Sequence, residues 1–345
     1  MQKFGYCKFQ SLSLPKLHLY GFLHKPTLKW ISIGARDTMR FLRVKAVLLL
    51  FFPLFLLIAA QGGIAQKRTD HDRDFWRAIA KNRYAVPEGE QVFLLVRELS
   101  SYLGLTDSEL RDELSYNILE SWIVEQGKLT TAELQSLAKE WQTNLQIGTG
   151  ESGTDTVFKR SFSALCLSLL AERDHKRPFL DEEHYRALLK NALAYLRDEH
   201  DLRGFDPVKG WIHTTAHTAD LLAELADNKF FKPADQRVVL DAIELRMSSA
   251  REIFSYGEQN RLAAVAATIA LRKDFDVQAF QQWLTNLNAA DQRVWKDSPP
   301  KLNLLQTFEN NTYFLRGLVG YLQVKCPDPT VVEVQKTVIQ SLRNR

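Results

Sequence analysis

Apolar side chains recur every three or four positions from about residue 72 onward, and no stretch shows the strict alternation of a β-strand. This period matches the 3.6 residues per turn of an α-helix, so each helix has one apolar face. We therefore expect an all-α protein of about twelve helices. The pattern predicts helices over 72–83, 91–103, 108–125, 130–145, 155–172, 181–198, 210–227, 234–246, 258–271, 277–287, 302–324 and 329–342.

Local sequence signals support several of these helix ends. Thr106 with Glu109, and Thr130 with Glu133, have the spacing of a capping box, in which each side chain bonds the other residue's backbone N–H. Gly127 follows the helix over 108–125 at a position where glycine commonly ends a helix. These signals predict that helices begin after Thr106 and Thr130.

Helices of this length, joined mostly by short links, form successive hairpins of about 40–50 residues per pair. Such a series predicts stacked antiparallel helical hairpins, as in a HEAT-like α-solenoid or α–α superhelix. A closed α/α toroid is the alternative, because no repeat at residue level decides between them. We expect a single all-helical domain over 66–345, since no linker-like stretch divides this range.

The first 65 residues have a different character. A short basic segment over 39–45 precedes an uncharged apolar run over 46–60, and Gly63 and Ala65 supply small residues after it. This is the order of a secretory signal peptide with cleavage near Ala65, which predicts a periplasmic or secreted protein. The run is shorter than the ~20 residues of a spanning helix. The alternative is an uncleaved leader that anchors the chain in the membrane.

Met39 is a second candidate start, because the basic segment of the signal peptide begins there. Residues 1–38 are mixed in composition and would be an unusual extension before such a peptide. We interpret them as an upstream extension that arises from a misassigned start codon.

Charge is distributed unevenly between this leader and the rest of the chain. The formal net charge is +4, but nine of the 45 Lys and Arg residues and only one of the 41 Asp and Glu residues lie in 1–65. The remainder has 36 basic and 40 acidic side chains. It therefore gives no electrostatic reason to expect a nucleic-acid partner.

Familiar catalytic and cofactor motifs are absent from the sequence. The glycines over 148–153 lack the Gly-Lys-Ser/Thr of a phosphate-binding loop, and no Gly-x-Ser-x-Gly occurs. After the leader only Cys166 and Cys326 remain, and their spacing does not suggest a disulfide. Cys166 lies in an apolar helical pattern and is interpreted as a small buried residue.

The strongest candidate for chemistry is the stretch that contains His213, His217 and Asp220. If 210–227 is one continuous helix, these side chains fall within an arc of about 60°. Two imidazoles and a carboxylate suit Zn²⁺ or Fe²⁺, with Glu258 as a further ligand from another helix. The stretch lacks the Glu that follows the first His in a zinc-protease helix.

Two interpretations without a metal stay open for the same residues. His213 and His217 could line a ligand-binding groove, with Asp220 fixing a tautomer or pairing with Arg261 or Arg160. Alternatively, all of them form a satisfied polar network between stacked helices.

Four further residues are candidates for ligand binding. Trp211 is either a core residue or the aromatic wall of a groove. Arg160, Arg261 and Arg316 each lie inside apolar helical patterns. Arginines in such positions form salt bridges or clamp an anionic ligand.

The segment over 203–222, which contains Gly-Trp-Ile-His-Thr-Thr-Ala-His-Thr-Ala-Asp, resembles the signature of a bacterial family known as domain of unknown function 2785. The likeness extends to 156–163, 256–263 and 311–318, and covers most of 90–325. At Gln259 and Asn260 this chain departs from the more acidic family pattern. The resemblance implies an all-helical domain and brings no established activity with it.

Two classes of function follow from these residues, and the sequence leaves open whether the protein is an enzyme. The first is a helical-repeat protein whose groove, centred on His213, His217 and Asp220, holds a peptide, a sugar or another protein. The second is a hydrolase or lyase of the cell envelope. It would use a histidine as base, with or without a metal, and Tyr256 or Tyr313 as acid.

Overall fold

The computed structural model describes residues 71–323 and 329–345. The interpretations of 1–38, of the signal peptide and of Cys326 lie outside these residues and stay predictions. Thr69–Arg345 forms one compact unit.

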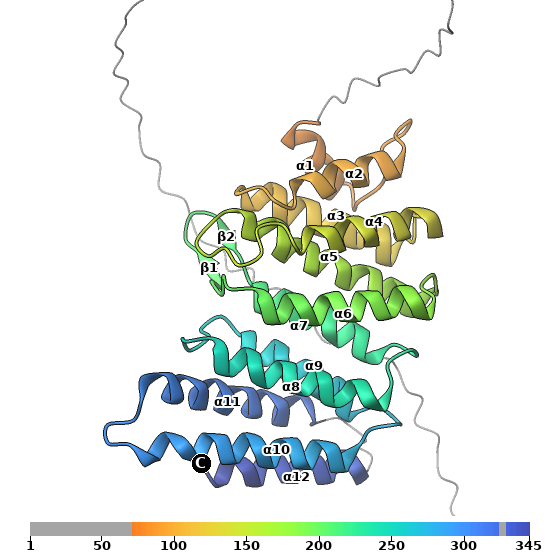
Figure 1. Ribbon diagram of the computed structural model, residues 1–345. Helices are drawn as coiled ribbons and strands as arrows, with labels where there is room; N and C mark the ends of the chain where they lie inside the picture. Colours follow the sequence, from red (N-terminus) through yellow and green to blue (C-terminus); the bar gives the residue numbers. More distant parts are fainter. Residues whose placement is uncertain (1–70, 324–328) are drawn as a thin grey trace, which may run out of the picture. The chain divides into compact units, whose positions relative to one another are not determined.

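The described chain is almost entirely helical (Figure 1). The elements are α1 Arg73–Lys81, α2 Val92–Tyr102, η1 Glu109–Tyr116, α3 Asn117–Glu120, η2 Ser121–Glu125, α4 Thr131–Asn144, α5 Thr156–Lys176, α6 Glu182–Asp198, β1 Phe205–Asp206, β2 Gly210–Trp211, α7 Thr214–Asp227, α8 Pro233–Ser249, α9 Glu258–Ala270, α10 Val277–Asp291, η3 Gln292–Lys296, α11 Leu302–Tyr321 and α12 Pro329–Arg343. The prediction of an all-α fold is confirmed. Its HEAT-like superhelix form, as opposed to a closed toroid, stays a prediction.

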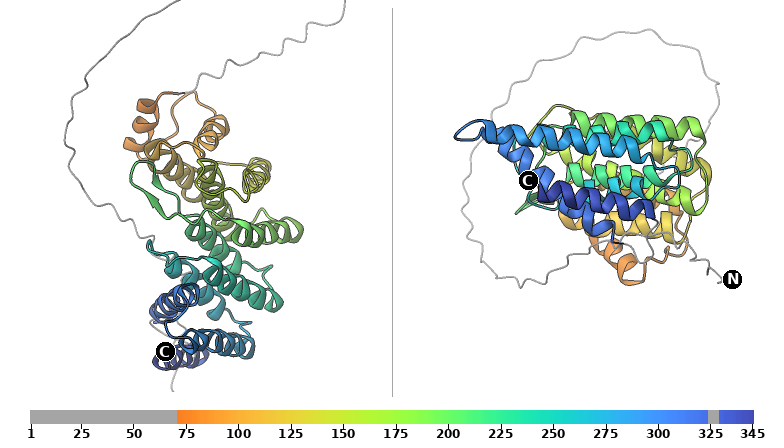
Figure 2. Two further views of the ribbon diagram at one scale, coloured as in Figure 1. Left: turned by 60° about the vertical axis from the view of Figure 1, so that its left-hand side comes forward. Right: turned by 90° about the horizontal axis from the view of Figure 1, so that it is seen from below.

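The longer helices form two rows that pack on each other (Figures 1 and 2). One row contains α5, α7, α9 and α11 in that order, and each contacts the next. In the other row α6 contacts α8 and α8 contacts α10, while α4 lies against α5 and α6 against α7. The first row is covered by the second, so α5, α7 and α9 bury most of their residues. Helices surrounded in this way need apolar or small side chains on nearly every face.

Small residues let the helices of the first row approach closely. An added Cβ at Gly317 of α11 would lie 2.6 Å from Oδ1 of Asn260 and 3.2 Å from Cβ of Ala263, both on α9.

In the part of the chain that the structure describes, no helix combines the length and the apolar character needed to cross a membrane.

The helix predicted over 108–125 differs in its internal geometry. It consists of two π-helical segments, η1 and η2, on either side of the short α3. Leu114, Ile118 and Trp122 are buried and follow one another at intervals of four. Such an interval drifts around an α-helix of 3.6 residues per turn, and the wider π turns reduce that drift.

One of the two predicted capping boxes forms. Thr130 and Glu133 exchange the expected bonds at the start of α4. The prediction of a capping box at Thr106 is wrong. At this helix start the carboxylate of Asp107 accepts the N–H of Leu110 instead. The Glu109 carboxylate bonds Arg73 and Arg77 of α1, at 2.7 and 2.6 Å.

The expectation of a helix from Gly210 and of no strands is also wrong. Helix α7 begins at Thr214, and Gly210 with Trp211 forms β2, which pairs antiparallel with β1. His213 adopts the left-handed conformation, with φ 51° and ψ 35°. The carbonyl oxygen of Gly204 accepts the N–H groups of Ile212 and His213, at 2.9 and 3.2 Å. The N–H groups of Ile212 and His213 are bonded to the preceding loop, and the helix begins at Thr214, four residues after the predicted start.

Candidate functional site

Arg111 anchors the β-hairpin to the helices. Its guanidinium donates to the carbonyl oxygens of Leu105, Lys209 and Trp211, at 2.6, 2.7 and 3.2 Å. The side chain is fully buried and lies over the ring of Phe158, with 4.1 Å from Cζ to the ring centroid. Burial lowers the pKa of Arg111 to about 10. The residue is therefore still charged at neutral pH and fixes the second strand.

The β-hairpin belongs to the loop that joins α6 to α7, and Arg160 anchors the beginning of this loop. Its Nε and Nη2 donate to the two carboxylate oxygens of Glu199, at 2.6 and 3.1 Å, and Nη1 donates to the carbonyl oxygen of Ile147 at 2.8 Å. Glu199 in turn accepts the N–H of Asp201. Of the two interpretations of Arg160, the contacts support the salt bridge.

His213 lies where this loop enters α7. Its ring stacks on Trp211, with centroids 4.2 Å apart and planes inclined by 28°. Its Nε2 is buried and has no hydrogen-bond partner among the described residues. The nearest carboxylate oxygen, Oε1 of Glu258, lies 4.0 Å away. The second helix of the site, α9, therefore brings Glu258 to His213, although not within hydrogen-bond distance.

The two members of this pair are both shifted toward their uncharged forms. Burial, with a smaller effect of Arg261, lowers the pKa of His213 to about 4, and a bond to the backbone of Tyr256 opposes the shift. Burial also raises the pKa of the Glu258 carboxyl, although bonds from its own backbone N–H and from that of Tyr256, the latter at 2.9 Å, oppose the shift. A neutral imidazole can accept a proton, and a protonated carboxyl can donate one.

His217 is held in one tautomer. The hydroxyl of Ser161 has a single proton, and the carbonyl oxygen of Ile212 can only accept it. The contact between Ser161 Oγ and His217 Nδ1, at 2.8 Å, must therefore be donated by Nδ1. Burial lowers the pKa of His217 well below its usual value, so the ring is neutral with its lone pair on Nε2.

Three aromatic side chains lie next to one another beside His213: Phe205, Trp211 and Tyr256. This cluster is here called the aromatic shelf. Phe205 and Trp211 meet edge to face at 4.8 Å, and Tyr256 lies 6.0 Å from Trp211. Phe205 is 40% exposed and Tyr256 is 48% exposed. Trp211 is half-buried and joins this exposed cluster, so it is not a fully buried core residue, and its role as the aromatic wall of a groove stays a prediction.

Gly204 is required where the loop passes beneath the shelf. An added Cβ would lie 2.3 Å from Cδ2 of Tyr256 and 2.7 Å from Oε1 of Glu258. Both distances are shorter than any real Cβ contact, so only glycine fits without displacing the shelf or the carboxylate.

Asp220 has a different role from the two histidines. Both of its carboxylate oxygens accept from Nη1 of Arg261 at 2.6 Å, which supports the predicted pairing of Asp220 with Arg261. Across residues 71–323 and 329–345, no group of three or more His, Cys, Asp or Glu side chains is arranged to hold a metal ion. His213, His217 and Asp220 thus do not converge on one point, and the residues do not fit the predicted Zn or Fe ligand set.

The remaining predicted residues lie away from His213. The Arg316 guanidinium lies over the ring of Tyr313, at 5.7 Å, and both belong to α11. Within the described chain, no contact joins either of them to the shelf.

Sequence reasoning missed the residues that support the site, among them Ser161, Gly204, Phe205 and Arg111. Ser161 and Gly204 lie within segments that carry the family resemblance, and this was the only signal for them. Arg111 could not have been found, because the two acceptors that tie it to the hairpin, the backbone carbonyls of Lys209 and Trp211, lie about a hundred positions away.

No curated protein and no solved structure matches this chain. The sequence profile of one family, described as "Protein of unknown function (DUF2785)", matches residues 145–319, which extend from the end of α4 to α11. The segments of the resemblance on α5, on the loop into α7 and on α9 meet at His213 and His217. The chain belongs to the family described as Protein of unknown function (DUF2785).

Proposed function

We propose that this protein binds a neutral, ring-shaped polar ligand of the sugar class at the aromatic shelf. The observation that carries the proposal is a contiguous set of exposed rings above a buried imidazole whose Nε2 lacks a partner among the described residues. Exposed aromatic clusters mark interaction sites, and a buried polar atom without a partner in a native protein calls for an explanation.

The charges around the shelf favour a neutral ligand. Lys209 pairs with Asp155, Arg203 with Asp201 and Arg261 with Asp220, each at 2.6 Å. His213 is neutral at pH 7 because its pKa is lowered to about 4. A charged ligand would therefore find no unmatched countercharge among these described residues. A sugar ring offers a C–H face to the aromatic rings and hydroxyl groups to the polar atoms at their edge.

The proposal is tested by titrating the purified protein with maltotetraose, cellotetraose and chitotetraose in a calorimeter. At least one should bind, and Tyr256→Ala should weaken that binding about two- to twelve-fold, because an aromatic contact contributes about 0.5–1.5 kcal/mol beyond its buried area. Tyr313→Ala is the matched control, since Tyr313 is 45% exposed but lies on α11. The absence of binding by all three sugars, or an equal effect of both substitutions, would contradict the proposal.

A second candidate function is acid–base catalysis at the same place, as a hydrolase or lyase. It is favoured by the proximity of a neutral His213, which can accept a proton, to Glu258, whose raised pKa favours the proton-donating form. Glu258→Gln separates the two functions. If the site is catalytic, the wild-type protein should hydrolyse or cleave the bound tetrasaccharide and the variant should not. If the site only binds, neither the wild type nor the variant should form product.

The location of this activity rests on the leader. A signal peptide cleaved near Ala65 would deliver the helical domain to the periplasm or the medium, where oligosaccharides of the cell envelope are found. N-terminal sequencing of the exported protein tests this part of the proposal, with a new N-terminus after Ala65 as the expected result.

A further inference from the structure

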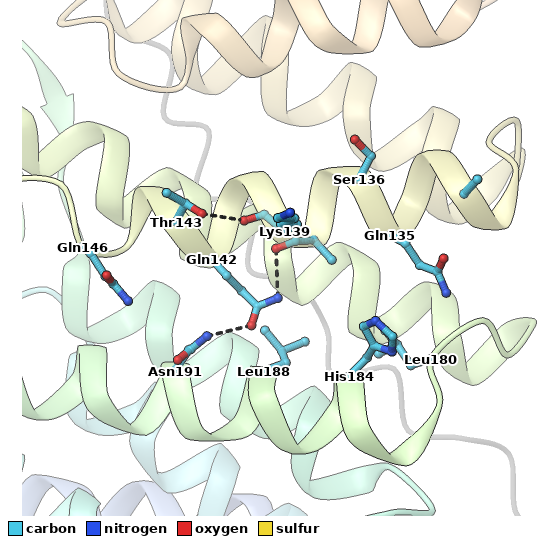
Figure 3. A pocket seen from close by; sticks show the side chains of 12 residues that line it. Gln135, Ser136, Lys139, Gln142, Thr143, Gln146, Leu180, His184, Leu188 and Asn191 are labelled. Carbon is cyan, nitrogen blue, oxygen red and sulfur yellow. Dashed lines mark hydrogen bonds between the residues drawn. The ribbon is translucent and has the colours of Figure 1, made fainter.

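A second candidate binding site lies between α4 and α6, on residues that the aromatic shelf does not use. Two hollows, of about 510 and 370 Å³, follow one another there. They share Gln142, Gln146 and Asn191, so they form one continuous feature, here called the α4/α6 groove (Figure 3).

The groove arises from an interruption in the packing of the second row of helices. Helix α6 contacts α8 and α8 contacts α10, but α4 packs mainly on α5 and α6 on α7. Helices α4 and α6 therefore do not pack extensively on each other. Figure 3 shows Gln135 and Gln142 of α4 directed toward α6, and Leu188 and Asn191 of α6 directed toward α4, whereas Ser136 and Thr143 lie on the other side of α4.

Amide side chains make up a large part of the lining. Gln135 and Gln142 of α4, with Gln146 in the turn after it, lie on one side, Asn191 of α6 lies on the other, and the buried Leu188 belongs to the same lining. Nδ2 of Asn191 donates to Oε1 of Gln142 at 2.9 Å, which joins the two helices across the groove. Amides both donate and accept hydrogen bonds, as a peptide backbone does. Such groups next to the apolar side chains of Leu180 and Leu188 suit an extended peptide, whose side chains alternate in direction.

One charge in the groove is unmatched. His184 accepts or donates a bond with Asp181 at 2.7 Å, and Asp198 pairs with Arg197 at 2.7 Å. The Lys139 ammonium is exposed and has no ion pair or hydrogen bond with any residue that the structure describes. Lys139 lies near the middle of the α4 wall, so the ligand needs an acidic side chain near its own middle.

The length of the groove sets the length of the ligand. From Ala132 to Gln146, two residues beyond the end of α4, this wall rises by about 21 Å if the helical rise of about 1.5 Å per residue is used throughout. An extended chain covers that distance in about six residues, at about 3.3 Å each. We propose that the α4/α6 groove binds an extended peptide segment of about six residues with a central Asp or Glu.

The test uses the purified protein and two fluorescein-labelled heptapeptides of Ser and Val, one with a central Glu and its twin with a central Lys. Fluorescence anisotropy should show the Glu peptide binding at least about five-fold more tightly, as expected for one surface ion pair of about 1 kcal/mol. Lys139→Met should abolish this preference. Lys190→Met is the matched control, because Lys190 is exposed on α6 next to Asn191 but does not line the groove.

Three results would overturn the proposal: neither peptide binds, the preference for Glu survives in Lys139→Met, or chitotetraose displaces the peptide, which would assign the groove to saccharides. Tyr256→Ala should leave peptide binding unchanged. The groove and the aromatic shelf can therefore fail or succeed independently.

Discussion

Two buried acid–base pairs lie at the two ends of the loop that leads from α6 into α7, and their polar atoms are satisfied to different extents. At one end, every nitrogen of the Arg160 guanidinium has an acceptor, and both oxygens of Glu199 are used. At the other end, Nε2 of His213 has no partner among the described residues, and Oε1 of Glu258 is 4.0 Å from it.

The difference indicates which pair is scaffold and which is site. When all polar atoms of a buried ion pair are hydrogen-bonded, these bonds offset the cost of removing the charges from water, and the pair can hold backbone segments in place. A buried pair with an unsatisfied polar atom is costly to the fold, at about 1–3 kcal/mol for such a group, and a cost of this kind is typical of functional sites. Among the described residues, the exposed rings of the aromatic shelf lie beside the pair of His213 and Glu258, whereas Arg160 and Glu199 are buried.

The largest expected effect concerns the bonded pair. Arg160→Met leaves the Glu199 carboxylate buried without its cation, and should lower the free energy of unfolding by about 3–5 kcal/mol. Urea denaturation followed by circular dichroism measures this. The double substitution Arg160→Met with Glu199→Leu should recover part of the loss. A loss below about 1 kcal/mol in the single variant would mean that the network is not the scaffold we describe.

The next effect concerns pH and the pair at His213. The pKa of His213 is lowered to about 4 from a usual value near 6.5, so between these values the unfolded chain binds more protons than the folded one. Stability is therefore lost as the pH falls from about 6.5 to about 4, by about 3 kcal/mol in full. The raised pKa of the Glu258 carboxyl acts in the opposite direction, so the measurement is the difference between two proteins: thermal unfolding across this range should lose less stability in His213→Gln than in the wild type. His217 acts in the same direction, so some slope should remain.

The smallest effect concerns the pair that is open to solvent. Arg261 is 39% exposed and Asp220 is 22% exposed, so Asp220→Asn should cost only about 0.5–1 kcal/mol in urea denaturation. It should also lower the pKa of His213 further, since the Arg261 charge would lose its counterion. An NMR titration of His213 checks the direction, and an increase in its pKa would contradict the electrostatic description of the site.

The helices could be predicted from the sequence because their apolar period is local. The stretch around Leu188 on α6, or the capping box at Thr130, carries its own information in a few neighbouring residues. The predicted pairing of Asp220 with Arg261 also agrees with the structure. The sequence left Arg160 open as an alternative partner, and Arg160 instead pairs with Glu199.

The geometry of the site could not be predicted in the same way. The left-handed conformation of His213 depends on bonds from its own N–H and that of Ile212 to Gly204. Strands of two residues, such as β2, are too short to show an alternation. The neutral state of His213 and the raised pKa of Glu258 arise from burial between helices, which no spacing along the chain reveals.

Gly204 has a consequence for how related chains can differ from this one. The space that its missing side chain leaves is filled by Tyr256 and by Glu258, about fifty positions further along the chain. These three positions are therefore one sterically linked unit, and we expect them to vary together. A related chain with a larger residue at the position of Gly204 should also have lost the aromatic ring or the carboxylate, and its amino-acid sequence alone would reveal that its site has changed.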